Sequence, residues 1–240
     1  MKQEKPKVAG LDGCPAGWLL FYGYNNEFDF QLISSIKEAI PIFEQCRYIF
    51  IDIPIGLSSK AYQRQVEGQM RKLLQGRSST IFTPPCREAI ECKDYAVANE
   101  VNRQITGKGL SVQAFNISKK IAEVDSFLRS KRDFSLQESH PEICSKILKG
   151  NVLQTKKNTM AGQRERRDII RSISPDLDLS VEKALGQYPK KMVRPDDIID
   201  AAMLCLSAQT GMVYHTLVWK DTHYFDHEGI EVSIAAGEIQ

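Results

Sequence analysis

Four aspartates have a placement that could bring their carboxylates to one site. Asp12 and Asp52 each follow an apolar stretch typical of a β-strand, whereas Asp197 and Asp200 lie three residues apart on a predicted helix, and therefore on one face of it. The carboxyl ends of parallel neighbouring strands meet at one edge of a sheet, where α/β proteins form their sites. We predict that these four side chains converge there.

Carboxylates gathered in this way need a cation. Two like charges about 4 Å apart repel by about 1 kcal/mol in water and by about 4 kcal/mol at an effective dielectric constant of 20. Hard oxygen ligands without a neighbouring Cys/His cluster favour Mg²⁺ or Mn²⁺. Two such ions, about 3.5–4 Å apart, can activate a water and stabilise the leaving oxygen of a phosphodiester. The four aspartates are therefore predicted metal ligands of a two-metal hydrolytic site.

Each acidic residue also has an ordinary structural interpretation. Asp12 precedes Gly13 and could form an Asx-turn, and Asp196 is suited to the start of a helix, where the dipole favours negative charge. Glu142 follows His140-Pro141 and is either a further ligand or an acidic residue in a first helical turn. Asp52 is harder to explain structurally, because it lies next to Ile53-Pro54 at the end of an apolar strand.

Basic residues are concentrated in two segments, although the formal net charge is only +2. The larger segment contains Lys146, Lys149, Lys156, Lys157, Arg164, Arg166, Arg167 and Arg171. The smaller one contains Lys60, Arg64, Arg71, Lys72 and Arg77. Basic faces of this kind attract phosphate backbones, whereas the ordinary alternative is a solvated helix face.

Hydrophobic periodicity and turn residues predict an α/β fold. The expected strands cover residues 7–12, 17–24, 27–32, 47–53 and 134–138. The expected helices cover residues 58–74, 88–105, 110–129, 142–149, 161–173 and 195–209, and a C-terminal β-hairpin over 214–234 closes near Glu228-Gly229. We interpret residues 1–240 as a single domain with a helical insertion at approximately 57–132.

Composition is that of a globular protein, with 240 residues of which 42% are hydrophobic and 26% charged. No apolar run approaches the ~18–20 residues that cross a bilayer, and the charged N-terminus lacks a secretory hydrophobic region. The six cysteines form no Cys-x-x-Cys pair, so we expect free thiols in a reducing compartment. These features favour a cytoplasmic protein with no membrane partner.

An ordered set of motifs resembles the family of predicted RNase H-like nucleases, a domain family of largely unknown function. The motifs are Gly10-Leu-Asp12-Gly-Cys-Pro-Ala-Gly-Trp18, Ile51-Asp52-Ile-Pro-Ile-Gly56, Arg77-Ser-Ser79, Pro85-Cys-Arg-Glu-Ala89, Gly109-Leu-Ser-Val-Gln113, Lys120-Ile-Ala-Glu-Val-Asp125, Ser139-His-Pro-Glu142, Gly162-Gln-Arg-Glu-Arg166 and Asp196-Asp-Ile-Ile-Asp-Ala201. The resemblance implies a ribonuclease H-like five-stranded mixed sheet flanked by helices, with acids on the first strand, the fourth strand and a late helix.

By position, those acids are Asp12, Asp52, and Asp197 with Asp200, and the last pair is similar to the C-terminal acidic motif of RuvC-type Holliday-junction resolvases. The resemblance also implies that further residues face the site, namely Arg87, Gln113, Glu123, Asp125 and Glu142. We therefore predict the catalytic residues Asp12, Asp52, Asp197, Asp200 and Glu142. The predicted substrate-binding residues are Arg77, Ser79, Arg87, Gln113, Lys156 and Arg166.

The function predicted from these residues is a Mg²⁺- or Mn²⁺-dependent nuclease that hydrolyses phosphodiester bonds in structured DNA or RNA. One alternative is a non-catalytic module of the same fold that binds nucleic acid or metal. Another is an ATP-dependent phosphotransferase of actin-like fold, which Asp12-Gly13 fits poorly as a phosphate loop and for which a second glycine-rich loop is missing. Nucleic acid is the expected partner, and a homodimer is compatible with the sequence.

Overall fold

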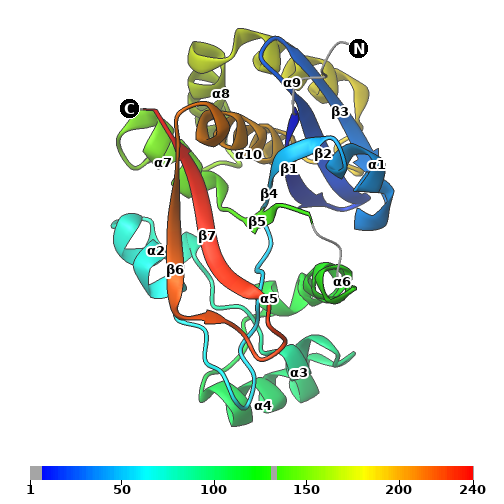
Figure 1. The fold of residues 1–240 in the computed structure, drawn as a ribbon, viewed down its shortest axis with the longest axis vertical. Helices are drawn as coiled ribbons and strands as arrows, with labels where there is room; N and C mark the ends of the chain where they lie inside the picture. The colour runs from blue at the N-terminus through cyan, green and yellow to red at the C-terminus, as the bar shows by residue number, and fades with distance from the viewer. Residues whose placement is uncertain (1–6, 131–133, 240) are drawn as a thin grey trace. The chain divides into compact units, whose positions relative to one another are not determined.

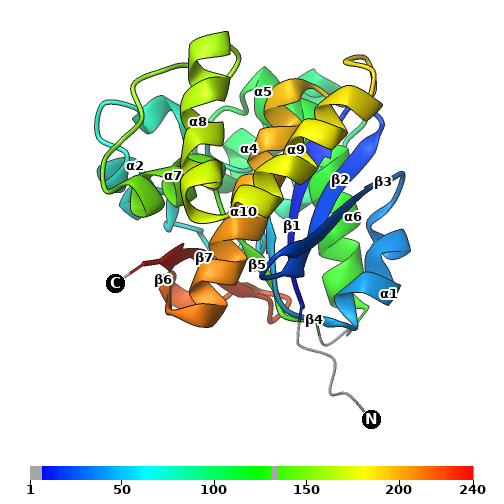
Figure 2. The same ribbon diagram turned by 90° about the horizontal axis from the view of Figure 1, so that it is seen from above.

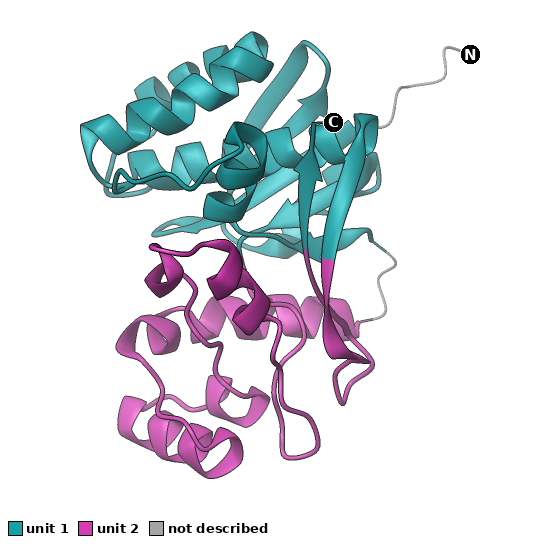
Figure 3. Cartoon of the chain, turned by 90° about the vertical axis from the view of Figure 1, so that its left-hand side faces the viewer, with its two compact units in different colours: residues 1–52, 133–218, 235–240 teal, residues 53–132, 219–234 magenta. Residues whose placement is uncertain are grey.

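The computed structural model describes residues 7–130 and 134–239, which divide into two compact units (Figure 3). Unit 1 comprises residues 1–52, 133–218 and 235–240, and unit 2 comprises residues 53–132 and 219–234. Unit 2 contains the segment that we predicted as a helical insertion, of which residues 131 and 132 lie outside the described part. The four aspartates at positions 12, 52, 197 and 200 all belong to unit 1.

Unit 1 is built on a five-stranded mixed sheet, as predicted, with the order β3-β2-β1-β4-β5 (Figure 1). The first three strands form an antiparallel meander, whereas β4 is parallel to both β1 and β5. The strands are β1 (Lys7–Cys14), β2 (Gly17–Tyr24), β3 (Glu27–Ile33), β4 (Cys46–Ile51) and β5 (Leu136–Glu138). Because β1 and β4 are parallel neighbours, their carboxyl ends lie at the same edge of the sheet.

Two strand ends differ from the sequence prediction, and both concern the candidate site. Strand β1 continues past Asp12 to Cys14, because Gly13 and Cys14 pair with the start of β2, so that Asp12 lies inside a paired strand. Strand β4 ends at Ile51, so that Asp52 follows the strand directly. The backbone N–H of Asp52 donates to the carbonyl of Leu11 over 3.0 Å, which keeps the two strands in register at this point.

Helices of unit 1 cover the sheet. They are η1 (Ile36–Ala39), α1 (Ile40–Phe43), α7 (Pro141–Lys149), α8 (Met160–Ile173), α9 (Pro175–Gln187) and α10 (Pro195–Val213). Helix α10 packs on β1, β2 and β4, and α9 packs on β3 and on α10, so both cover the same face (Figure 2). Helix α9 was not predicted; its first residue, Pro175, occupies the helix position that proline favours.

Helices are the main regular secondary structure of unit 2. Its helices are α2 (Glu67–Leu73), η2 (Ser78–Thr80), α3 (Arg87–Ile90), α4 (Tyr95–Thr106), α5 (Val112–Asn116) and α6 (Ser118–Arg129). The three long helices predicted here were wrong in extent, because polar side chains satisfy backbone groups locally instead of continuing the helix. Ser58 accepts from the N–H of Arg64 before α2 begins, and Asp94 and Ser111 cap the starts of α4 and α5.

The C-terminal segment forms the predicted β-hairpin, with β6 (His215–Phe225) and β7 (Glu231–Glu238). The connection contains Gly229 at φ +76°, in the left-handed region that glycine adopts most readily. The second strand extends four residues beyond the predicted end at 234. Each strand of the hairpin contributes residues to both units.

The six cysteines are free thiols, and Cys14, Cys86, Cys144 and Cys205 are buried. Burial raises the pKa of Cys144 to about 11, so this side chain is a protonated thiol near neutral pH. Four of the cysteines therefore act as small apolar side chains in the interior. Within the part of the chain that the structure describes, no helix has the length and apolar character needed to cross a membrane.

Candidate functional site

The four predicted aspartates come from three separate parts of unit 1 and influence one another electrostatically. Asp12 lies on β1, Asp52 follows β4, and Asp197 and Asp200 occupy the first two turns of α10. Asp200 is almost completely buried, with 1% of its surface exposed, and Asp12 is 7% exposed. The negative charges of Asp52, Asp200 and Asp197 all act on Asp12. The structure thus brings these four side chains into one cluster, which we call the carboxylate cluster.

Close packing of α10 on β1 creates this cluster. A Cβ atom placed on Gly10 would lie 2.1 Å from the backbone nitrogen of Cys205 and 2.5 Å from the carbonyl oxygen of Ala201. Only glycine therefore allows the helix to approach the strand this closely, two residues before Asp12. At the helix start, Asp197 accepts a hydrogen bond from the N–H of Arg194 over 3.1 Å, which stabilises the first turn.

Desolvation is the main reason why the carboxylate cluster holds protons more tightly than free aspartate does. Burial, together with the charges of Asp52 and Asp200, raises the pKa of Asp12 well above its usual value. Burial raises the pKa of Asp52 to about 7, with the charges of Asp200 and Glu142 acting in the same direction. The pKa of Asp197 rises to about 6, again chiefly through burial. Perturbed acids of this kind concentrate at functional sites.

One ammonium group partly neutralises the cluster. Lys157 Nζ donates to Asp200 Oδ2 over 2.5 Å, and its side chain remains 42% exposed. The charges of Asp200, Asp12 and Asp52 raise the pKa of Lys157, so this side chain remains protonated. Lys157 belongs to the basic segment seen in the sequence, but it was not among the predicted site residues. Its position in a loop after α7 gave no signal of the contact with α10.

By donor type, the cluster suits a hard divalent cation, because it offers carboxylate oxygens without a competing thiol or imidazole. By arrangement, the described residues contain no group of three or more His, Cys, Asp or Glu side chains already positioned to hold a metal ion. Lys157 takes one oxygen of Asp200. The carboxylates are therefore the right type of donor for a divalent cation, while the positive charge at Asp200 in this structure is the ammonium of Lys157.

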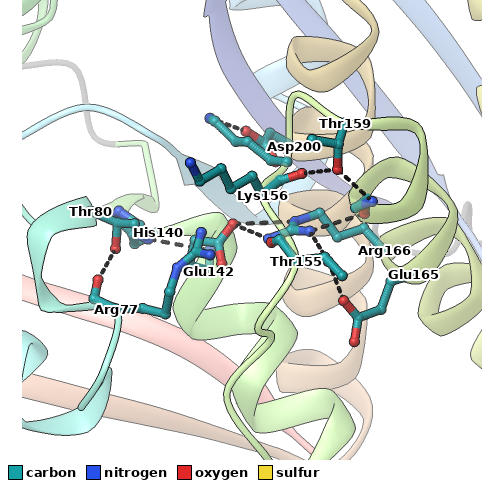
Figure 4. A network of polar contacts seen from close by, with 12 residues as sticks. Arg77, Thr80, His140, Glu142, Thr155, Lys156, Thr159, Glu165, Arg166 and Asp200 are labelled. Carbon is teal, nitrogen blue, oxygen red and sulfur yellow. Dashed lines mark hydrogen bonds and ion pairs between the residues drawn. The ribbon is translucent and has the colours of Figure 1, made fainter.

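Glu142 lies within electrostatic reach of Asp52 but is held by an arginine. Arg166 Nη2 donates to Glu142 Oε1 over 2.5 Å, and Arg166 itself is 2% exposed (Figure 4). Arg166 also donates to the carbonyl of Gly162 over 2.9 Å. The structure therefore places Arg166, a predicted substrate-binding residue, in a buried ion pair with Glu142, a predicted catalytic residue.

Three further basic residues of the large segment also have acidic partners that the sequence did not reveal. Lys149 pairs with Glu165 over 2.5 Å, and Arg167 and Arg171 share Asp178, each over 2.8 Å. Lys156 is exposed and lies in the same loop as Lys157. Ion pairs therefore account for much of this segment, and Lys156 is its predicted substrate-binding residue at the surface.

The remaining predicted substrate-binding residues belong to unit 2. Ser79 and Gln113 are exposed and Arg77 is half-buried. Arg87 is buried and binds two carboxylates, Asp125 over 2.6 Å and Asp226 over 2.7 Å, while its Nη1 has no hydrogen-bond partner in the described structure. Asp226, which follows β6, was not predicted, because nothing in the local sequence of the hairpin turn indicates a partner 139 residues away.

One family model matches this chain, over residues 10–216, and the motifs of the carboxylate cluster lie inside that range. No curated protein and no solved structure matches the chain significantly. The matched segment includes β1 from Gly10 onward, the other four strands of the sheet and all of α10. The chain therefore belongs to the family described as protein of unknown function (DUF429).

Proposed function

We propose that this protein is a Mg²⁺- or Mn²⁺-dependent nuclease that hydrolyses phosphodiester bonds in structured DNA or RNA. The observation that carries the proposal is the carboxylate cluster, in which four aspartates from three segments share a single ammonium group. Burying so many like charges is unfavourable, and proteins retain such arrangements where a function requires them. The proposed ligands are Asp12, Asp52, Asp197 and Asp200.

The architecture supports the resemblance to RNase H-like nucleases. The sheet is five-stranded and mixed, helices flank it, and the acids lie on the first strand, directly after the fourth strand and on a late helix. These are the features that the resemblance implies, and an RNase H-like fold is part of the proposal. Fold alone does not decide chemistry, so the argument for hydrolysis depends on the cluster itself.

In this mechanism, the aspartates bind and orient rather than react. Bound divalent metal would supply Lewis-acid stabilisation to the phosphodiester and lower the pKa of a water. Asp12 and Asp52 are fixed by the β1–β4 register, and Asp197 and Asp200 by the packing of α10 on Gly10. Lys156, exposed in the adjacent loop, is placed to attract the phosphate backbone.

The test is a cleavage panel of labelled single strands, duplexes, RNA–DNA hybrids and branched junctions, with Mg²⁺, Mn²⁺ or EDTA. Removing a side chain that only hydrogen-bonds to a metal ligand lowers metal affinity or activity by about 10–100-fold. Asp52→Asn changes a proposed ligand itself, so it should reduce cleavage by at least about 100-fold. The matched control is Asp168→Asn, an exposed carboxylate of α8 paired only with Arg171, which should leave the rate unchanged. Cleavage that needs no divalent metal, or that survives in Asp52→Asn, would refute the proposal.

A non-catalytic module that binds nucleic acid or metal is the second candidate, and the Lys157–Asp200 contact favours it, because this ion pair already compensates one acid. Binding that weakens steeply with salt, without any turnover on the same panel, would support this candidate over a nuclease.

An ATP-dependent phosphotransferase has less support, because the Ala16 N–H in the β1–β2 turn already donates to the carbonyl of Met192. Saturable ATP binding by calorimetry would revive it.

A further inference from the structure

The backbone of Lys157 is anchored in a tight turn. The N–H and the hydroxyl of Thr159 both donate to the carbonyl of Lys156, over 3.0 and 2.8 Å, which closes a tight turn around Lys157. Gly162 packs against the same carbonyl so closely that a Cβ there would lie 2.0 Å from it. The backbone of Lys157 is therefore held beside the carboxylate cluster.

Arg166 secures this loop from the other side. Its guanidinium donates to the carbonyl of Thr155 over 3.3 Å and to the carbonyl of Gly162 over 2.9 Å, while Glu142 balances its charge (Figure 4). The hydroxyl of Thr155 in turn donates to Glu165. The buried Glu142–Arg166 pair thus fixes the loop that carries Lys157, while the side chain of Lys157 extends from this loop to Asp200.

The two ends of the Lys157–Asp200 contact differ in their access to water. Asp200 has a side chain that is 1% exposed, so its negative charge is stabilised by a cation nearby rather than by water. Lys157 is 42% exposed at its side chain, so part of this side chain already lies in contact with solvent. Whichever cation replaces Lys157 at Asp200 must therefore be supplied from outside the chain.

We propose that Lys157 is a built-in competitor for the divalent metal, which holds Asp200 until the metal arrives and is then released toward the solvent. The inference rests on the proposed function, because it assumes that the carboxylate cluster binds the metal. It predicts a metal affinity weaker than the ligands alone would give, since each binding event must break the ion pair. It also predicts that the released ammonium, beside Lys156, adds a second positive charge at the surface when the metal is bound.

The first experiment titrates Mn²⁺ into the full chain by calorimetry and by electron paramagnetic resonance, without nucleic acid. Lys157→Gln removes the competing charge and should bind Mn²⁺ at least about tenfold more tightly than the wild type, whereas Lys157→Arg should stay close to the wild type. Lys156→Gln, an equal charge change one residue away at an exposed position, is the matched control and should leave the affinity within about twofold.

Equal or weaker Mn²⁺ binding by Lys157→Gln overturns the proposal, and so does an absence of Mn²⁺ binding to every variant. If Lys157→Gln fails to fold without metal, a measurement on the wild type decides the matter. Acylation of lysine amines, read residue by residue by mass spectrometry, should increase at Lys157 on addition of Mn²⁺ and stay constant at Lys156. Unchanged or reduced labelling of Lys157 contradicts the release of its side chain.

These readouts separate the inference from the nuclease proposal. If the protein binds Mn²⁺ in competition with Lys157 but cleaves nothing, the inference about Lys157 holds and the nuclease proposal is refuted. If Lys157→Gln changes neither the metal-dependent cleavage nor the Mn²⁺ affinity, the nuclease proposal holds and the inference about Lys157 is refuted.

Discussion

Two clusters of buried charge, one in each unit, are arranged in opposite ways. In unit 2, one guanidinium, Arg87, binds Asp125 and Asp226, and Asp226 accepts three further hydrogen bonds from the backbone N–H groups of Leu57, Glu228 and Ile230. Asp125 gains a second cation in Arg129, over 3.0 Å. In unit 1, the four aspartates of the carboxylate cluster share Lys157, while the N–H groups of Gly13 and Arg194 donate one hydrogen bond each, to Asp12 and Asp197. The acids of the unit 2 pair thus have more donors each than the acids of the carboxylate cluster.

This difference separates a structural charge cluster from a functional one. Acids that are satisfied by arginines and backbone N–H groups hold segments distant in sequence together, as Asp226 does for the hairpin turn and Leu57. Buried acids with few donors have raised pKa values, as Asp12, Asp52 and Asp197 do, and a bound cation would stabilise their charged forms. The number of donors per carboxylate therefore indicates which cluster serves the fold and which is available to a ligand.

The largest expected effect is on the unit 2 cluster. Asp226→Ala leaves Arg87 with one partner and three backbone N–H groups without an acceptor, so the free energy of unfolding should fall by about 3–5 kcal/mol, as when a buried ion pair loses one member. Urea unfolding followed by circular dichroism measures it. Asp168→Ala removes an exposed acid 3.2 Å from Arg171 and should cost less than about 1 kcal/mol. Similar losses in both variants would erase the distinction between satisfied and surface acids.

Comparable in size is the pH dependence of unit 1. Asp52 and Asp197 have folded pKa values of about 7 and about 6, above the ordinary 3.8, so the folded state holds protons that the unfolded state has lost. Their contribution to stability is fully present below about pH 4 and is lost as the pH rises toward 7. Each such carboxyl contributes a decline of about 1.4 kcal/mol per pH unit within this window.

Urea unfolding in EDTA between pH 4 and pH 8 tests the direction. The free energy of unfolding of the wild type should fall more steeply with rising pH than that of Asp52→Asn, which has one carboxyl fewer in the cluster. Parallel curves would mean that Asp52 is as well satisfied as the acids of unit 2, and the contrast between the clusters would fail.

The smallest expected effect disturbs the carboxylate cluster without touching a charge. Gly10→Ala places a Cβ 2.1 Å from the backbone of α10 and should destabilise the fold by about 1–3 kcal/mol, as overpacked cores do. Because α10 must shift, Asp197 and Asp200 should move from Asp12 and the pH dependence should weaken. Gly186→Ala, on α9 with nothing within 4 Å, is the control and should gain up to about 1 kcal/mol from helix propensity. Equal behaviour of the two variants would contradict the role of Gly10.

Much of the local structure of unit 1 was readable from the sequence. The strand 17–24 was predicted with its observed bounds, and the start of α10 at Pro195 was predicted from the helix position that proline favours. These features depend on residues close together in the chain, whose periodicity and turn types are visible at once. The helices of unit 2 were less predictable, because Asp94 caps a helix start inside the predicted helix 88–105, and the predicted helix 110–129 is divided at Ile117.

The sequence by itself determined which aspartates could meet, since Asp12 and Asp52 follow apolar strands and Asp197 and Asp200 share a helix face. Only the tertiary structure decided how each acid is compensated. Lys157 reaches Asp200 across 43 residues and Arg87 reaches Asp226 across 139, and such pairs depend on how helices, loops and strands pack. The residue type fixes the sign of a charge, whereas the distance between opposite charges depends on how the chain folds.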